Sequence, residues 1–256
     1  MYPNLFSIGP LTIHTYGVFV AMGFLSGILI SIKMGKAMGI TSQQVMDMGF
    51  VIILSGLIGS HLAYVFMNLS YYRGNPFDIL KIWDGGLVFS GGLIAVAATM
   101  FIYAKKKKLS VWRIGDLWSP AAALGQAIGR VGCFMAGCCF GRPTHLIWGV
   151  TFRNPESLAP LNIPLHPTQL YSALSGFIIF IILSLLSAKK KFEGQIFIWF
   201  LILHSTARLL LERFRGDNRG PIPGSEWTVT QLISISILII SVLLLFIVKS
   251  RHEKRL

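Results

Sequence analysis

Seven long apolar runs, separated by short polar segments, dominate the chain. They cover residues 14–32, 46–68, 86–104, 116–135, 168–187, 194–212 and 229–248. A helix of about 20 apolar residues spans the hydrocarbon core of a bilayer. The pattern therefore predicts an all-α polytopic membrane protein with about seven transmembrane helices.

The fourth of these runs, 116–135, is the weakest. It is rich in glycine and alanine, begins beside Asp116 and ends in a glycine-rich segment. Small residues favour close packing between membrane helices. We interpret the run as a span; the alternative for its last part is a partly re-entrant segment.

The distribution of positive charge predicts the orientation of these helices. Fourteen of the 23 basic residues fall on one set of connections, namely Lys33, Lys36, the lysines at 105–108, Arg113, the lysines at 189–191, Lys249, Arg251, Lys254 and Arg255. Lys and Arg accumulate in short cytoplasmic segments. We therefore expect the N-terminus outside, the C-terminus in the cytoplasm, and outer loops near 69–85, 136–167 and 213–228.

The first apolar run is expected to be a retained helix. Residues 1–13 contain no Lys or Arg, and no small-residue cleavage site follows the run. A cleaved signal peptide has a basic start and such a site. The run at 14–32 is therefore counted as a transmembrane span.

Composition agrees with a membrane protein and excludes one class of partner. Apolar residues make up 54% of the chain and charged residues only 13%, against roughly 25% charged in soluble domains. The net charge of +13 could indicate nucleic-acid binding. The positive charge is confined to short clusters between apolar runs, so no nucleic-acid partner is expected.

The nine basic residues on the outer side differ in kind from the cytoplasmic ones. One is a lysine and eight are arginines: Lys81, Arg73, Arg130, Arg142, Arg153, Arg208, Arg213, Arg215 and Arg219. The planar guanidinium group suits bidentate binding of phosphate or carboxylate, so we predict contact with an anionic lipid headgroup. The alternative is that each arginine pairs with a nearby acid such as Glu212, Asp217 or Glu226.

The three cysteines of the chain, Cys133, Cys138 and Cys139, lie within seven residues of one another. Adjacent cysteines have poor geometry for a structural disulfide, although Cys133 could pair with either of the others. The chain has no CxxC motif, and a zinc site would need further ligands at suitable spacing. Neither a metal ion nor another cofactor is predicted.

Two groups of arginines could carry chemistry. Arg130 lies near the outer end of an apolar span, where an unpaired charge is costly and is therefore a functional hypothesis. The alternative is a packing helix whose arginine snorkels to the interface. Arg208, Glu212 and Arg215 have the spacing of one helical face, which fits either an Arg–Glu pair that holds the second arginine toward a ligand or a plain salt-bridge ladder.

Taken in order along the chain, five segments resemble the prolipoprotein diacylglyceryl transferase family. They are residues 13–17, 83–92, 129–134, 166–171 and 208–215. Each segment alone is a weak signal, whereas the complete order is specific, and the resemblance covers nearly the full length. It implies a single transmembrane transferase domain over residues 1–256.

The resemblance implies an enzyme that moves diacylglyceryl from phosphatidylglycerol to the lipobox cysteine of a prolipoprotein signal peptide. The thiol attacks the glyceryl carbon that bears the phosphate, so that a thioether forms and glycerol phosphate leaves. The phosphodiester needs cationic groups as its leaving group gains charge, and the thiol must lose its proton. The expected location is the bacterial inner membrane, multi-pass, with the active site toward the outer face.

The resemblance also implies the residues of the site. The catalytic residues would be Arg130, Arg208, Tyr16, His14 and His204. Residues that bind phosphatidylglycerol would include Arg130 and Arg208, together with Arg215, Glu212, Ser90, Gly91, Gly92, Cys133, Gly141, His166 and Gln169.

Several positions depart from the family pattern. Ser90 stands where members of the family carry a histidine that is often proposed as the base. Cys133 and Ala136 replace asparagines, Cys138 replaces a glutamate, and His204 replaces a tyrosine. His14, His204 or ordered water would then assist removal of the thiol proton, with His204 compensating for Ser90.

Three alternatives remain open at this point. The first is a paralogous lipid-headgroup transferase with another acceptor. The second is a thiol–disulfide membrane oxidoreductase that uses Cys133, Cys138 and Cys139. The third is an anion transporter, although the arginines lie at the outer ends of the spans rather than in their middles.

Overall fold

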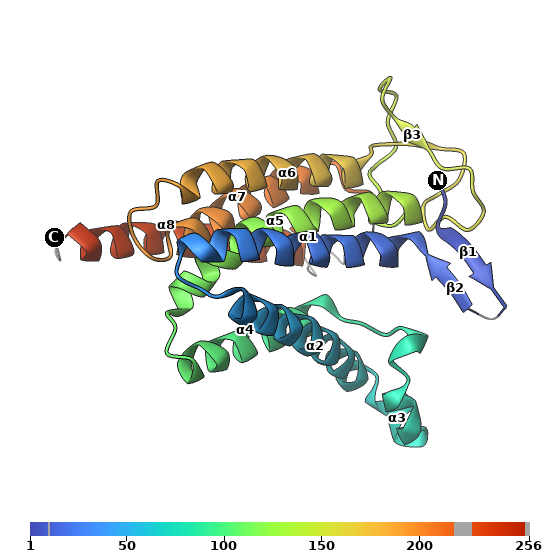
Figure 1. Cartoon of the computed structure of the whole chain (residues 1–256). Coiled ribbons are helices and arrows are strands. Elements are labelled where there is room, and N and C mark those ends of the chain that lie inside the picture. Colours follow the sequence, from blue (N-terminus) through green and yellow to red (C-terminus); the bar gives the residue numbers. More distant parts are fainter. Residues whose placement is uncertain (10, 218–226, 254–256) are drawn as a thin grey trace. The chain divides into compact units, whose positions relative to one another are not determined.

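Helices form wherever the chain has a long apolar run. The computed structural model describes residues 1–9, 11–217 and 227–253, and Figure 1 shows its helices and strands. The helices that contain the seven runs are α1 (Thr15–Ala37), α2 (Ser42–Met67), α4 (Phe89–Lys106), α5 (Val111–Ala136), α6 (Thr168–Ser187), α7 (Gln195–Glu212) and α8 (Val229–Glu253).

By length and composition, five of these helices can cross a membrane: α1, α2, α6, α7 and the Val229–Ser250 part of α8. The chain is therefore a mostly helical protein with several candidate spans, as the apolar pattern predicts. The number of seven spans and the orientation of the two termini stay predictions.

Two helices begin earlier than the apolar pattern indicates, because polar residues cap them. At the start of α2, the Thr41 hydroxyl accepts from the Gln44 N–H, and the Gln44 side chain accepts from the Thr41 N–H. Such a capping box satisfies two helix-end donors at once. At the start of α5, the Ser110 hydroxyl accepts from the Arg113 N–H, so Asp116 lies inside the helix rather than at its beginning.

The chain divides into two compact units. The larger unit comprises Met1–Ile30 and Gly115–Leu256, and the smaller unit comprises Ser31–Ile114. Each unit is described by itself below. The single domain expected over 1–256 stays a prediction.

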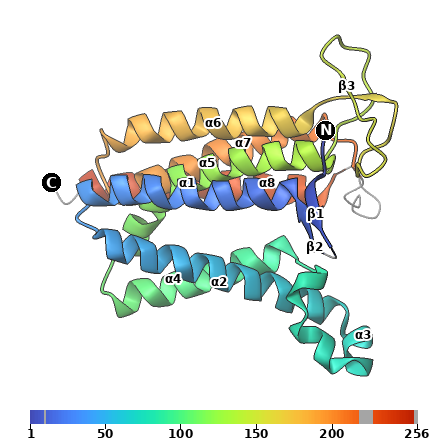
Figure 2. The same ribbon diagram turned by 45° about the vertical axis from the view of Figure 1, so that its right-hand side comes forward.

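In the smaller unit, α2 and α4 pack side by side along a seam of small residues, as both Figure 1 and Figure 2 show. A Cβ atom added at Gly59 would collide with Ala95 and would lie 2.9 Å from the Gly91 carbonyl oxygen. One added at Gly92 would lie 2.8 Å from the Gly56 carbonyl oxygen. The glycines therefore allow the two backbones to approach closely.

The predicted loop near 69–85 is largely helical. It contains α3 (Leu69–Gly74) and the 3-10 turns η1 (Pro76–Leu80) and η2 (Ile82–Asp84). The buried imidazole of His61 on α2 holds this segment, since its two nitrogens lie 2.8 Å from the Ile79 carbonyl oxygen and 3.1 Å from that of Gly86. The sequence analysis did not single out His61.

In the larger unit, α1, α5, α6, α7 and α8 run alongside one another (Figures 1 and 2). Small residues again permit close packing, because a Cβ atom at Gly23 of α1 would lie 2.9 Å from the Gly125 carbonyl oxygen of α5. Ala123 of α5, Ile179 and Leu183 of α6 and Ile196 of α7 form a buried apolar cluster.

The buried carboxylate of Asp116 joins α5 to the turn between α6 and α7. One of its oxygens accepts from the Gly194 N–H at 2.7 Å and pairs with Lys190 at 3.1 Å, and the other accepts from the Phe197 N–H at 2.9 Å. An anion at a helix N-terminus is favourable because unpaired N–H groups point toward it. Asp116 is thus a structural anchor in the run that the apolar pattern marks as weak.

Short strands add to the predicted all-α fold. Strands β1 (Asn4–Ile8) and β2 (Leu11–His14) form an antiparallel hairpin before α1, and β3 (Val150–Thr151) pairs with β4 (Pro164–Leu165) between α5 and α6. The segment at 136–167 also has a small core of its own around Phe152, which is 1% exposed. Because this core consists of single apolar residues scattered among prolines, it gives no periodic signal in the sequence.

Part of the predicted outer loop at 213–228 lies outside the described residues, which stop at 217 and resume at 227. Arg219 and Glu226 belong to that part. Lys254 and Arg255 of the basic tail also lie outside the described residues.

Candidate functional site

A small hollow lies between α5, α6 and α7. Its polar lining residues are Gln126, Arg130, Ser172, Ser175, His204 and Arg208. Gly176, Ile179, Ala207 and Leu211 complete its wall. Polar groups from three helices therefore face one space inside an apolar bundle, and ligands of helical bundles bind in such places.

Arg130 enters the hollow from the last two turns of α5. Its side chain is partly buried, and its guanidinium group forms no hydrogen bond or ion pair with any residue that the structure describes. A charge in an apolar setting without a partner is expensive. An anionic ligand in the hollow would supply that partner.

Arg208 and Glu212 form an ion pair on α7. The guanidinium Nη1 of Arg208 lies 2.9 Å from Oε2 of Glu212, and both side chains are mostly buried. The other carboxylate oxygen, Oε1, accepts from the Thr228 hydroxyl at 3.0 Å. The spacing of these two residues correctly predicted the pair, and Glu212 orients Arg208 along the wall of the hollow.

Arg215 does not continue the helical face of Arg208 and Glu212, so that prediction is wrong. Helix α7 ends at Glu212, and Arg215 instead forms an isolated bridge with Gly141. Its guanidinium group makes two hydrogen bonds with the Asp217 carboxylate, of 2.7 and 2.6 Å. Acid pairing, the alternative to headgroup binding, therefore accounts for Arg208 and Arg215 but not for Arg130.

The two candidate histidines have different positions. His204 lies one turn before Arg208 on α7, lines the hollow, and stacks on Phe200 with ring centroids 5.5 Å apart. His14 ends β2 at an exposed position, where its Nδ1 donates to Oδ1 of Asn4 at 2.7 Å. His14 is therefore not among the residues that line the hollow.

Tyr16 lies in the first turn of α1, close to the end of α5. A Cβ atom added at Gly132 would lie 3.3 Å from the Cα atom of Tyr16. The Tyr16 hydroxyl is near enough to Arg130 and to the three cysteine thiols to interact with them electrostatically. The structure thus brings Tyr16 to the same end of the larger unit as the hollow.

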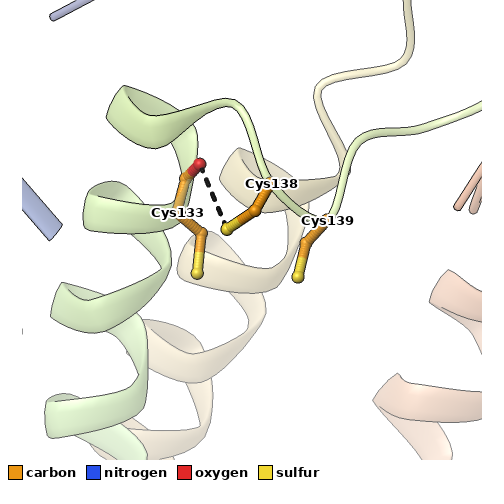
Figure 3. A group of neighbouring side chains, drawn as sticks. All are labelled: Cys133, Cys138 and Cys139. Atoms are coloured by element: carbon orange, nitrogen blue, oxygen red, sulfur yellow. Dashed lines mark hydrogen bonds between the residues drawn. The ribbon is translucent and has the colours of Figure 1, made fainter. Parts of the chain in front are cut away.

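The three cysteines form one cluster. Their sulfur atoms all lie within 4.8 Å of one another, and none of the three forms a disulfide. Figure 3 shows Cys133 on the last turn of α5 and Cys138 and Cys139 on the segment that follows it. The Cys138 thiol points back toward the Cys133 carbonyl oxygen, 3.7 Å away. Hydrogen bonds from the other two thiols and from Arg215 lower the pKa of the Cys139 thiol.

The backbone of this cluster is held by the first turn of α6. The side chain of Gln169 donates to the Cys138 carbonyl oxygen, and that of Thr168 donates to the Cys139 carbonyl oxygen, each at 2.8 Å. Both side chains are fully buried. Gly137 has a φ of +79°, and a Cβ atom there would collide with Ser157. The turn at Gly137 therefore folds Cys138 and Cys139 back toward Cys133.

Gly141 and His166 lie where three segments meet. The Gly141 N–H donates to the His166 carbonyl oxygen at 3.1 Å, and a Cβ atom on Gly141 would lie 2.8 Å from the Phe214 carbonyl oxygen. The His166 ring packs on Phe214 and lies 3.3 Å from the Tyr171 hydroxyl. Both residues thus support the site's framework, and their contact with a headgroup stays a prediction.

Ser90, Gly91 and Gly92 belong to the smaller unit, in the first turn of α4. Gly91 and Gly92 pack against α2 along the seam described above, which explains the glycine-rich sequence without a ligand. Their predicted binding of phosphatidylglycerol stays a prediction.

The sequence analysis missed three polar residues of the hollow: Gln126, Ser172 and Ser175. Gln126 precedes Arg130 by four residues and Ser172 precedes Ser175 by three, and residues at these spacings share a helical face. A search for polar residues on the faces that carry arginines would have found Gln126. The serines give a weaker signal, because serine is common in membrane helices.

The chain matches known proteins over most of its length. A family model described as prolipoprotein diacylglyceryl transferase matches residues 3–247. A phosphatidylglycerol–prolipoprotein diacylglyceryl transferase of Clostridium tetani (strain Massachusetts / E88) is 36% identical over 253 residues, which are 99% of this chain and 100% of that protein. The protein of the same name from Bordetella avium (strain 197N) is 33% identical over 259 residues, with 99% and 96% covered. That of Oleidesulfovibrio alaskensis (strain ATCC BAA-1058 / DSM 17464 / G20) is 37% identical over 219 residues, with 83% and 79% covered. Because the family model and these relatives match nearly the whole chain, the chain belongs to the prolipoprotein diacylglyceryl transferase family.

Proposed function

We propose that this chain transfers a diacylglyceryl group from phosphatidylglycerol to the lipobox cysteine of a prolipoprotein. The observation that carries the proposal is the guanidinium of Arg130, which has no partner among the described residues and lies in a polar hollow of a membrane-type bundle. Membership of the family supports the donor and the acceptor that its relatives' names give. The oxidoreductase and the anion transporter have no comparable support.

Arg130 and Arg208 bind the phosphate of the donor lipid. The two arginines line the hollow from facing helices, and the ion pair with Glu212 limits the rotamers open to Arg208. Negative charge grows on the phosphate as the glyceryl carbon leaves it, and guanidinium groups fixed beforehand stabilise that change. Ser172, Ser175 and Gln126 offer hydrogen bonds to the glycerol hydroxyls of the headgroup.

The acceptor thiol attacks the glyceryl carbon and becomes a thioether sulfur. Attack requires the thiolate, and Ser90 supplies no imidazole for its formation. His204 lines the same hollow as the two arginines and is the imidazole nearest to the donor phosphate in this proposal. His14 lies on the exposed hairpin, where it would meet the acceptor rather than the lipid.

The proposed location is the bacterial inner membrane, with the N-terminus outside and the active site toward the outer face. The cytoplasmic side then carries the lysine-rich connections. A signal peptide would approach along the membrane and present its cysteine at the level of the lipid phosphate. Both substrates would therefore meet without leaving the bilayer.

The deciding experiment is incubation of the purified chain with phosphatidylglycerol and a lipobox peptide. We expect a diacylglyceryl mass shift on the peptide cysteine and release of glycerol phosphate. A peptide with serine in place of the cysteine is the acceptor control, and phosphatidylethanolamine is the donor control. If the cysteine peptide receives no diacylglyceryl group although lipid and protein are both intact, the proposed function is wrong.

A further inference from the structure

The cysteine cluster has the dimensions of a metal site. The three sulfurs lie within 4.8 Å of one another, and they are all the cysteines that the chain contains. In a tetrahedral centre with Zn–S bonds of about 2.3 Å, the sulfurs are roughly 3.8 Å apart. Side-chain rotations that move each sulfur atom by about one ångström or less therefore bring all three to one ion.

The fold holds these side chains in place at some cost. Cys139 has a φ of +61°, a conformation that costs a non-glycine residue on the order of 1 kcal/mol. Hydrogen bonds from the buried Thr168 and Gln169 to the carbonyl oxygens of Cys139 and Cys138 impose it.

Charge around the cluster suits bound thiolates. Arg215 is fixed by its two hydrogen bonds with Asp217 and also interacts electrostatically with the Cys139 thiol. Donors of this kind orient metal-bound sulfur and offset its negative charge. The spacing of the cysteines is not CxxC and predicted no metal, whereas the turn at Gly137 brings the three thiols together.

We propose that Cys133, Cys138 and Cys139 bind one Zn²⁺ ion whose fourth position takes the thiol of the acceptor cysteine. The inference rests on the proposed transferase function. Three protein ligands with an open position distinguish catalytic zinc sites from structural ones. A thiol that binds zinc gives up its proton, so the ion replaces the base that is missing at Ser90.

The position of the cluster suits this role. Cys133 follows Arg130 by three residues on α5, and such side chains are neighbours with Cβ atoms about 5–6 Å apart. The two also interact electrostatically. In this proposal, the residues that hold the thiol and the phosphate are thus neighbours one helical turn apart on α5, and the glyceryl carbon is one bond from the phosphate oxygen.

The step balances without an oxidant or a reductant. On binding to the ion, the acceptor thiol releases its proton to water. Its sulfur lone pair then forms the C–S bond as the glyceryl C–O bond breaks, and the electrons of that bond stay on the phosphate oxygen. The products are a neutral thioether, which leaves the ion, and glycerol phosphate with one more negative charge than the diester had.

The first test measures the metal itself in the full-length chain in detergent. We expect about one zinc per chain and, after exchange with Co²⁺, a sulfur-to-cobalt charge-transfer band. The Cys133→Ser/Cys138→Ser/Cys139→Ser variant should lose both, whereas Thr206→Val, an exposed position on α7, should retain them. If the wild-type chain binds no stoichiometric zinc or cobalt through sulfur, the proposal is wrong.

The second test asks whether the acceptor thiol binds the ion. Addition of a lipobox peptide to the Co²⁺-loaded chain should raise the charge-transfer band by roughly one third, since the Co–S bonds increase from three to four. The peptide with serine at that position should leave the band unchanged. An unchanged band with the cysteine peptide would overturn the role of the fourth position.

The third test separates this proposal from the transferase function. Removal of zinc by a chelator, and each of the changes Cys138→Ser and Cys139→Ser, should lower transfer at least tenfold. Phosphatidylglycerol binding should change less than twofold in each case. Added zinc should restore transfer only in the chelated wild type. Full transfer by the triple serine variant would overturn the metal proposal and leave the transferase function supported. A cobalt band that responds to the peptide, with no transfer from any donor lipid, would instead support the metal site and contradict the transferase function.

Discussion

At the scale of single residues, Arg130 differs from the other arginines in its environment. Arg208 and Arg215 have carboxylate partners, whereas the Arg130 guanidinium has none among the described residues. Desolvation of a charge is offset only when a partner is supplied. The donor phosphate fills that role in the proposed function, so Arg130 should be more sensitive to substitution than residues that already have partners.

We expect Arg130→Gln to lower the rate of transfer about 100-fold or more, since each charge-assisted hydrogen bond contributes about 1.5–3 kcal/mol. The transfer rate of Arg130→Lys should lie between those of the wild type and Arg130→Gln, because lysine keeps the charge but not the planar fork. Lys189→Gln removes one positive charge from an exposed position and serves as the control. The measurement is the initial rate of diacylglyceryl transfer to a lipobox peptide, and a rate for Arg130→Gln within threefold of wild type would contradict the role.

The sequence could identify the chemistry of single residues but not all of their contacts. Arg130 and the Arg208–Glu212 pair follow from span position and from spacing along one helix. Arg215 does not, because α7 ends three residues earlier, and no helix-stop signal such as glycine precedes it. The three thiols come together because of a left-handed turn at Gly137 and hydrogen bonds from α6. Both depend on contacts between residues far apart in the sequence, which spacing along the chain does not reveal.

At the scale of helices, the anchor of α7 is a buried carboxylate on another helix. Asp116 of α5 accepts from two backbone N–H groups at the start of α7 and pairs with Lys190. The apolar pattern located α5 and α7 correctly but marked Asp116 as a defect, because the pattern counts charge and not its partners. The short strands escaped prediction for a related reason, since strands of two to five residues carry little periodic signal.

We expect Asp116→Ala to destabilise the chain by about 3 kcal/mol, because two buried N–H groups and the Lys190 ammonium would lose their acceptor. Glu193→Gln, an exposed acid in the same turn, should change stability by less than about 0.5 kcal/mol. Thermal unfolding in detergent, followed by circular dichroism, measures both. Equal unfolding midpoints for the two variants would show that Asp116 is not an anchor.

At the scale of the whole molecule, the positive charges and the apolar helices predict how the chain lies in a membrane. The lysine-rich connections before α2, after α4 and between α6 and α7 would face the cytoplasm. The β1–β2 hairpin and the segment at 136–167, with the cysteine cluster beside it, would then face outward. Family membership, in contrast, rests on the family model and the relatives that match most of the chain, and does not depend on orientation.

Labelling with a membrane-impermeant maleimide tests this orientation. In the triple serine background, Thr12→Cys on the hairpin should react in intact spheroplasts. Lys107→Cys after α4 should react only after the membrane is permeabilised. The opposite pattern would reverse the predicted topology, and labelling of both positions in intact spheroplasts would contradict a fixed one.

Helix α5 carries the anchored charge of Asp116 in its first half and, near its other end, Arg130, which we propose binds the donor; their spacing has a mechanical consequence. Asp116 and Arg130 are separated by about 21 Å along the helix axis, whereas the hydrocarbon layer of a bilayer is about 30 Å thick. If α5 spans the bilayer as the apolar pattern predicts, with Asp116 at the inner boundary, the backbone of Arg130 would lie several ångströms below the outer one. A lipid bound there would be drawn inward from its leaflet, or the bilayer would thin around it. Thin membranes would reduce that work, so acyl-chain length would govern the rate of a reaction that takes place entirely at the headgroup.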